Sequence, residues 1–178
     1  SMYHAGWAWA GNTPFHHTKL VASHCGGTRN PMGISWPKGI KPDKTPRAQF
    51  HHVNDIAPTI YEIVGIKPPK VVDGFAQDPV DGVSLAYTFA DAKALTRKKV
   101  QYFDNNGSRA IYQDGWVAAT FGPLTPWLPG APGLAAWDSA KDKWELYNIA
   151  RDFSEADDLA AKEPQRLAQL QRTFDRLA

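Results

Sequence analysis

The sequence has little of several features that would narrow its function at once. Its 178 residues include a single cysteine, so no disulfide can form within the chain, and the compartment stays open. No apolar run is long enough to cross a membrane, so we expect no membrane partner. The net charge is only +2, and lysines and arginines are scattered, so a nucleic-acid partner is not expected either.

Common metal-binding patterns are also missing. Neither a C-x-x-C nor an H-x-x-x-H spacing occurs, and the neighbours in His16-His17 and His51-His52 would point to opposite faces of an extended segment. Residues 103–108, FDNNGS, lack the acidic ladder and distal glutamate of a calcium loop, so a turn is the expected structure. We therefore expect no metal site and no cofactor site within this chain.

What the chain does contain is typical of a globular protein. Hydrophobic residues make up 43% of it, aromatic residues 12% and charged residues 21%. A chain of this length can bury roughly two-thirds of its unfolded surface without disulfides or metals. No internal repeat is visible, and we predict a single domain over residues 1–178.

An antiparallel sheet is predicted in the second half of the chain. Apolar and polar residues alternate over 99–104 and 109–121, and Asp114-Gly115 is a strong hairpin signal. Residues 143–149 predict a closing strand. Between them, residues 122–133 hold seven prolines or glycines in twelve positions, which predicts an irregular excursion.

Helices are expected around this sheet. Asp55 can cap a helix that ends at Gly65, and Pro164 can open a last helix with an apolar face. That face is formed by Leu167, Leu170, Phe174 and Leu177. Shorter elements are a helix over 18–23, a strand over 32–37, a loop over 36–49, a helix over 84–90 and a helix start capped by Ser154. The predicted fold class is α+β, a small antiparallel β-sheet flanked by helices.

Cys25 next to His24 raises the hypothesis of a thiol nucleophile. Catalytic Cys-His pairs usually come from separate segments, and side chains adjacent in sequence rarely face one another. A buried or incidental cysteine is the better interpretation. An independent hydrolase that uses Cys25 and His24 would lose its activity in Cys25→Ala, and we expect no activity to be lost.

Several segments, taken together and in order, resemble the C-terminal part of type I sulfatases. The likeness is to bacterial arylsulfatases of the alkaline-phosphatase superfamily and spans nearly the whole chain. The segments are TPFHHTKLVASHCGGTRNPMGISWP (13–37), HHVNDIAPTIYEIVGI (51–66), DGVSLAYTF (81–89), NGSRAIYQDGWVAAT (106–120) and WELYNIARDFSEADDLA (144–160).

This resemblance implies one site residue. In such sulfatases the lysine ahead of the Gly-Gly turn contacts the sulfate group, and by position this residue is Lys19. The family often has Glu-Gly-Gly where this chain has Cys25-Gly26-Gly27. Without the resemblance, Lys19 would be interpreted as an ordinary surface lysine.

The family's other catalytic groups do not occur in this sequence. Its nucleophile is a formylglycine made from the cysteine of C-x-P-S-R, whereas Cys25 is followed by Gly-Gly-Thr-Arg. The Asp-Asp and Asp-Asn pairs that hold calcium in the intact enzymes belong to the N-terminal catalytic α/β domain, which we expect to be absent. The chain is therefore expected to be the C-terminal subdomain of a metal-dependent sulfuric ester hydrolase and to be inactive alone.

Two functions stay open at this point. One is the C-terminal portion of an arylsulfatase that contributes Lys19 to a sulfate ester site; the other is a truncated, non-enzymatic module that binds a partner or a sulfated ligand. The expected partner is the missing N-terminal domain, or a second copy through apolar surface from Trp7, Trp9 and Phe15. The sequence identifies neither the natural ester nor the compartment, bacterial cytoplasm or periplasm.

Overall fold

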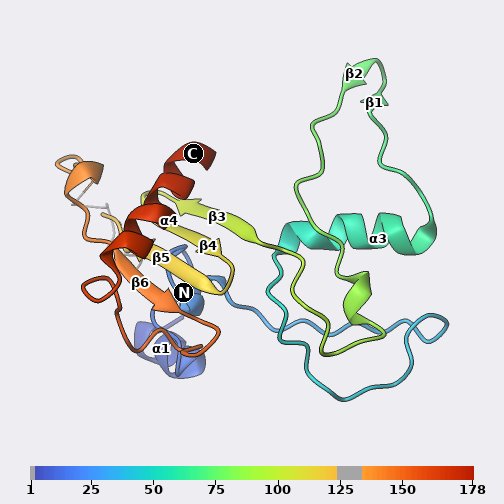
Figure 1. Cartoon of the computed structure of the whole chain (residues 1–178), viewed down its shortest axis with the longest axis horizontal. Coiled ribbons are helices and arrows are strands. Elements are labelled where there is room, and N and C mark those ends of the chain that lie inside the picture. The colour runs from blue at the N-terminus through green and yellow to red at the C-terminus, as the bar shows by residue number, and fades with distance from the viewer. Residues whose placement is uncertain (1–2, 124–133) are drawn as a thin grey trace. The chain divides into compact units, whose positions relative to one another are not determined.

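A computed structural model describes residues 3–123 and 134–178 and divides the chain into two compact units (Figure 1). Unit 1 consists of Ser1–Pro31 and Val100–Ala178, and unit 2 of Met32–Lys99. Helices and antiparallel strands occur together, which confirms the predicted α+β fold. Most of the predicted excursion over 122–133 lies outside the described residues.

Unit 1 contains a four-stranded antiparallel sheet. Its strands pair in the order β3 (Val100–Asn105), β4 (Ser108–Gln113), β5 (Trp116–Thr120) and β6 (Glu145–Asn148). Two-residue turns join the first three strands, Asn106-Gly107 and Asp114-Gly115, and all four turn residues have positive φ. Turns of this kind match the twist of paired strands, which is why Asn-Gly and Asp-Gly are favoured there. The predicted hairpin and closing strand are confirmed.

The helix α4 (Pro164–Leu177) packs on one face of this sheet. In the sheet register Ile111 lies opposite Ala118, and Ala118 opposite Leu146, so all three side chains share a face. They form a core with two α4 residues, Leu170 and Phe174. The predicted last helix is confirmed, although Leu177 is exposed rather than part of the packed face.

The opening part of the chain belongs to unit 1 and buries Val21, Ser23 and His24 there. It contains the helices α1 (Ala5–Asn12) and α2 (Cys25–Thr28). The predicted helix over 18–23 is wrong: these residues form turns, and α2 begins only at Cys25. Leu20 has φ 80°, outside the range of a right-handed helix.

Unit 2 is built around the 3₁₀ turn η1 (Val53–Asp55), which leads into the helix α3 (Ile56–Val64). The helix ends at Gly65, whose φ is 71°, as the sequence predicted. The side chain of Asp55 does not cap α3; it accepts a hydrogen bond from the His52 N–H and closes η1. Beyond α3 lies a short hairpin of β1 (Val71–Val72) and β2 (Phe75–Ala76), visible in Figure 1.

Three of the shorter elements differ from their predictions. Residues 32–37 form no strand, and Met32 and Ile34 are exposed, because no strand in the described chain pairs with them. The 3₁₀ turn η2 (Ala86–Thr88) stands where a helix over 84–90 was expected. Ser154 starts no helix: its hydroxyl donates to the Asp152 carboxylate within a series of turns. The loop over 36–49 is confirmed, and a further 3₁₀ turn, η3, spans Ser139–Lys141.

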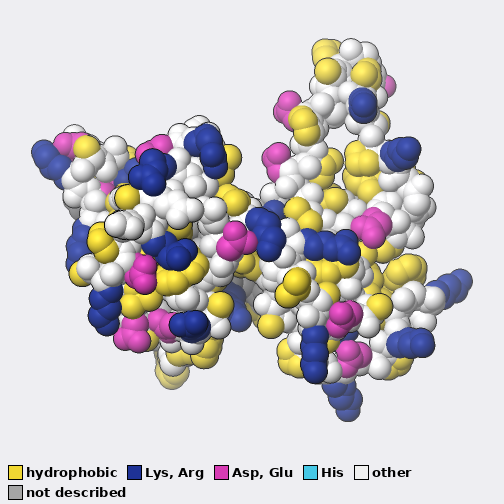
Figure 2. All heavy atoms as spheres, viewed as in Figure 1, with side chains coloured by type: hydrophobic (Ala, Val, Ile, Leu, Met, Phe, Trp, Pro, Cys, Tyr) yellow, Lys and Arg dark blue, Asp and Glu magenta, His cyan; other side chains and the backbone are white. Residues whose placement is uncertain are grey.

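Basic and acidic side chains are interspersed over the face of the molecule shown in Figure 2. Apolar side chains lie between them, including some at the β1–β2 hairpin, where Phe75 is exposed. No helix within the described parts of the chain is both long and apolar enough to cross a bilayer.

Candidate functional site around Lys19

Lys19 lies in a tight turn, called here the Lys19 turn (residues 18–21). The Val21 N–H donates to the Thr18 carbonyl at 3.1 Å, and Leu20, the third residue of the turn, has φ 80°. This geometry normally requires glycine at the third position, and an ordinary L-residue there costs about 1–2 kcal/mol. Contacts from outside the turn must therefore hold Leu20 in place.

The β3–β4 hairpin supplies these contacts. Asn105 Nδ2 donates to the Leu20 carbonyl at 2.7 Å. Three positions further on, the Ser23 N–H donates to Ser108 Oγ at 3.1 Å, and Ser108 Oγ donates to Ser23 Oγ at 3.0 Å. Each of the three bonds is worth about 1 kcal/mol, so together they are enough to offset the strain at Leu20. The turn is thus attached to the sheet just after Lys19.

The Gly26-Gly27 pair allows α2 to lie directly against this segment. A Cβ atom on Gly26 would lie 2.1 Å from the His16 carbonyl oxygen, and one on Gly27 would lie 1.9 Å from that of Val21. The Gly26 N–H donates to the His16 carbonyl at 2.9 Å. The two glycines are needed for close backbone approach, which is the structural reason for the Gly-Gly after Cys25.

Lys19 itself is exposed. Within residues 3–123 and 134–178 no other group forms a hydrogen bond or ion pair with its ammonium. The side chain is therefore available to an anion that approaches from outside. Beside the turn, Thr18 shares a hollow of about 290 Å³ with Ala5, Gly6 and Trp9.

A polar network that is buried at Ser23 and His24 and partly exposed at Glu145 lies next to the turn. His24 is 2% exposed; its Nδ1 lies 2.7 Å from Ser23 Oγ and its Nε2 lies 2.9 Å from Glu145 Oε2. Tyr147 Oη donates to the same carboxylate oxygen at 2.9 Å. The hydrogen bond from His24 lowers the pKa of Glu145, and the Tyr147 bond adds to this against the effect of burial. Burial, and then the Glu145 charge, raises the pKa of Tyr147.

The order Ser23, His24, Glu145 has the connectivity of a hydrolase triad. Ser23 is 2% exposed, however, and its hydroxyl oxygen already contacts both His24 and Ser108. No substrate carbonyl or sulfur could reach an oxygen in that position. The network therefore holds residues 23 and 24 on the sheet and has no nucleophilic role.

Cys25 does not have the properties of a nucleophile. Burial raises the pKa of its thiol to about 12, and the nearby Glu155 carboxylate contributes in the same direction. The thiol is thus protonated at neutral pH, whereas a reactive cysteine needs the thiolate. Both ring nitrogens of His24 are engaged with Ser23 and Glu145, so His24 cannot activate Cys25. The geometry argues against a Cys25–His24 hydrolase.

Three histidine rings gather beside this network. The centroid of His17 lies 4.6 Å from that of His24 and 6.4 Å from that of His16, and its ring also contacts Phe121. Burial, followed by the two neighbouring histidines, lowers the pKa of His17 to about 4. In unit 2, His51 bonds Asp55 and Tyr87 through its two ring nitrogens. Over the described residues, no group of three His, Cys, Asp or Glu side chains is arranged to hold a metal ion.

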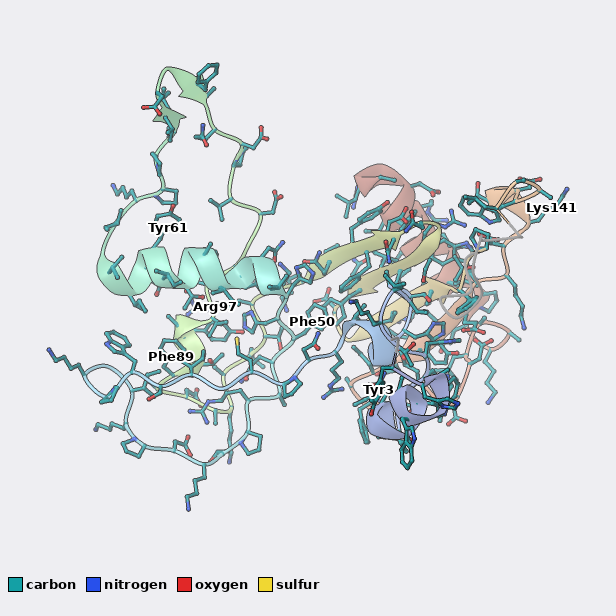
Figure 3. The ribbon with its side chains drawn as sticks, turned by 180° about the vertical axis from the view of Figure 1, so that it is seen from behind. Tyr3, Phe50, Tyr61, Phe89, Arg97 and Lys141 are labelled. Atoms are coloured by element: carbon teal, nitrogen blue, oxygen red, sulfur yellow. The ribbon has the colours of Figure 1, made fainter. Side chains whose placement is uncertain are left out.

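Part of the expected apolar surface is present on α1. Trp7 is 68% and Trp9 49% exposed. Phe15 is instead half-buried: its ring contacts Phe153, and the Arg29 guanidinium lies 5.0 Å from its centroid. Tyr3, just before α1, is likewise exposed at the surface of unit 1 (Figure 3).

Sequence reasoning singled out Lys19 but missed the residues that hold its turn. Ser108 is 85 positions from Ser23, Glu145 is 121 from His24, and Glu155 is 130 from Cys25. No local pattern connects residues so far apart. The resemblance of 13–37 and 144–160 to one family was the available signal that these segments belong to one site.

No known protein-family model matches the sequence. Solved structures do share its fold. BT33336S-sulf of Bacteroides thetaiotaomicron, from a core genetic locus for the metabolism of multiple glycosaminoglycans, is 19% identical with a TM-score of 0.63, covering 88% of this chain and 30% of that chain. Ps i-CgsB is 22% identical with a TM-score of 0.64, covering 93% and 32%. The protein yidJ of Bacteroides fragilis, assigned as a sulfatase, is 19% identical with a TM-score of 0.50, covering 80% and 28%.

The class of structure follows from these matches. The chain has the α+β fold of the C-terminal subdomain of sulfatases, which confirms the resemblance at the level of fold. It spans about 30% of the length of the solved chains that it matches.

Proposed function

We propose that this chain forms the C-terminal part of a sulfuric ester hydrolase and contributes Lys19 to its sulfate site. The fold supports the proposal, since nearly the whole chain matches the C-terminal subdomain of sulfatases. The observation that carries it is the exposure of Lys19 on a turn whose conformation is held from both sides.

The chemistry of Lys19 is electrostatic. Hydrolysis of a sulfate monoester gives an alcohol or phenol and sulfate, and negative charge is carried by the sulfate oxygens throughout. A solvated ammonium about 4 Å from an anion gains only about 1 kcal/mol, which would barely hold sulfate on the isolated chain. In a site closed to water, one donor fixed beforehand is worth about 10²- to 10³-fold in rate. Lys19 is therefore effective only when another domain covers it.

The remaining catalytic groups would come from elsewhere. The described residues do not provide a ligand set for calcium, and Cys25 is not in a formylglycine motif. In the proposed enzyme the calcium and the formylglycine would both belong to the N-terminal part. The isolated chain is accordingly expected to be inactive.

The alcohol part of the ester is suggested by the hollow beside the turn. The exposed indole of Trp9 in that hollow offers a flat apolar surface, on which an aromatic ring or the apolar face of a sugar could stack. An aryl sulfate and a sulfated saccharide are the two candidates. The first follows the sequence resemblance; the second follows the glycosaminoglycan locus of BT33336S-sulf.

The test compares this chain with a longer protein that carries the same sequence as its C-terminal part. Hydrolysis of 4-nitrophenyl sulfate and of a sulfated disaccharide is measured for both. We expect no turnover by the 178-residue chain, turnover by the longer protein, and a loss of about 10²-fold or more in kcat/KM for Lys19→Ala. Lys162→Ala, which removes another exposed lysine of unit 1, is the matched control and should keep full activity.

Two results would contradict the proposal. One is turnover of either ester by the isolated chain. The other is equal activity of the Lys19→Ala and Lys162→Ala forms of the longer protein. A longer protein that binds sulfated saccharides but hydrolyses none would instead favour the non-enzymatic binding module.

A further inference from the structure

Asn105, at the end of β3, belongs to the support of the Lys19 turn. Its Nδ2 donates to the Leu20 carbonyl at 2.7 Å, and its Oδ1 accepts from Asn106 Nδ2 at 3.1 Å. We propose that Asn105 is a positioning residue for Lys19, which holds the turn so that the ammonium meets the sulfate in one fixed place. This inference rests on the proposed function of Lys19.

The hydrogen bond acts at the point of strain. Leucine has no side-chain polar group to stabilise a positive φ, so Leu20 would return to a negative φ if nothing held it. That change would rotate the peptide planes around residue 20 and redirect the preceding Lys19 side chain. Among the described contacts, Asn105 provides the side-chain donor to the Leu20 carbonyl.

Asn105 is suited to this role because its own backbone is fixed. It pairs with Ser108 across the Asn106-Gly107 turn, in which both residues have the positive φ typical of a tight hairpin. Ser108 in turn bonds Ser23. The same hairpin end therefore fixes the chain at two places after Lys19, and a sheet is a more rigid support than a loop.

A second asparagine holds the segment before Lys19. Asn12 Nδ2 donates to the His17 carbonyl at 3.0 Å and to the Gly26 carbonyl at 2.8 Å. These bonds lie outside residues 18–21 and do not touch the Leu20 peptide. Asn105 is thus the residue whose loss should free the turn itself.

The first experiment measures the turn directly in the 178-residue chain. The variants are Asn105→Asp, which keeps the size and the acceptor but loses the donor, and Asn105→Ala. Backbone ¹⁵N heteronuclear NOE values should fall for the Lys19 and Leu20 amides in both variants and stay unchanged in β4 and β5. Asn30→Asp, the same change at an exposed asparagine of unit 1, should leave the turn as it is. Unchanged NOE values and chemical shifts at Lys19 and Leu20 in both Asn105 variants would overturn the inference.

The second experiment uses the longer protein and a double-mutant cycle. Asn105→Asp and Asn105→Ala should each lower kcat by about tenfold or more with little change in KM, since displaced catalytic groups act mainly on the chemical step. In the Lys19→Ala background the same changes should cost nothing further. If the Asn105 substitutions lowered kcat by the same factor in the Lys19→Ala background, Asn105 would act independently of Lys19, and the inference would be refuted. If the longer protein hydrolyses no sulfate ester, the proposed function fails, while the NOE values still decide whether Asn105 holds the turn.

Discussion

The ammonium Nζ of Lys98 lies 2.8 Å from Oδ1 of Asp55, and the two side chains are only 3% and 0% exposed. Burial opposes ionisation of Asp55, but hydrogen bonds from Lys98 and from the His52 and Val83 N–H groups outweigh it and lower its pKa. In unit 2, all of which is described, Leu85 is the only buried hydrophobic residue, with 4% of its surface exposed. This ion pair therefore stands at the centre of a unit with a small apolar core.

Removing the ammonium should consequently destabilise unit 2. In Lys98→Met the Asp55 carboxylate stays buried without its cation, and such a change costs about 3–5 kcal/mol. Lys70→Met removes an exposed lysine of the same unit and should change the free energy of unfolding by less than about 0.5 kcal/mol. The free energy of unfolding of each variant is measured in urea, with amide hydrogen exchange in α3 as the probe of unit 2. Equal stability of the two variants would show that the pair contributes little.

His17 should make unit 1 less stable as the pH falls. Its pKa is about 4 in the folded chain against an ordinary value of 6.5, so between these values the unfolded chain binds a proton that the folded chain does not. The free energy of unfolding therefore decreases as the pH falls from 6.5 to about 4. His17→Asn should flatten this dependence, because the asparagine amide does not take up a proton in this pH range. Asparagine also tolerates the φ of 65° at this position.

The measurement is chemical unfolding at pH 7, 6, 5 and 4. A His17→Asn chain with an undiminished slope would mean that other groups cause the acid sensitivity.

The elements predicted correctly are those that local chemistry determines. Asp114-Gly115 fits a tight turn with two positive φ values, Gly65 ends α3 in the left-handed conformation, and Pro164 opens α4. The elements predicted wrongly depend on distant contacts. Residues 18–23 have a helical pattern, but Asn105 and Ser108 hold them in turns. The acidic run at 152–158 looks like a helix start, but Glu155 is buried against the N–H of Cys25.

The same distinction between local chemistry and distant contacts applies to the candidate site. Lys19 could be singled out from the sequence through the family resemblance, and its exposure is as expected for a contact residue. Its role with sulfate stays a prediction. The need for glycine at 26 and 27 became clear only from the carbonyl groups of residues 16 and 21 that lie against them. A pattern of residue types does not show which backbone atoms will meet.

Cys25 should react slowly with thiol reagents in the folded chain. With a pKa of about 12, the thiolate is about one part in 10⁴ at pH 8, whereas an unfolded cysteine is about one-quarter ionised. Alkylation by iodoacetamide at pH 8 should therefore be at least about a hundredfold slower in buffer than in guanidinium chloride. Glu155→Gln removes the neighbouring negative charge and should increase the rate in buffer. Equal rates in buffer and denaturant would mean that the thiol is neither buried nor shifted.

Gly27→Ala should disrupt the packing of α2 on the segment that carries Lys19. The new Cβ would lie 1.9 Å from the Val21 carbonyl oxygen and 2.8 Å from that of Thr18, both of them backbone atoms that cannot move without opening the Lys19 turn. Overpacking of this kind costs about 1–3 kcal/mol. Gly11→Ala is the matched control: its Cβ would meet nothing within 4 Å, and alanine in a helix such as α1 should stabilise by up to about 1 kcal/mol. In thermal unfolding, the midpoint temperature should be lower for Gly27→Ala and higher for Gly11→Ala than for the unchanged chain. If Gly27→Ala were as stable as the unchanged chain, the close approach of α2 to residues 18–21 would be wrong.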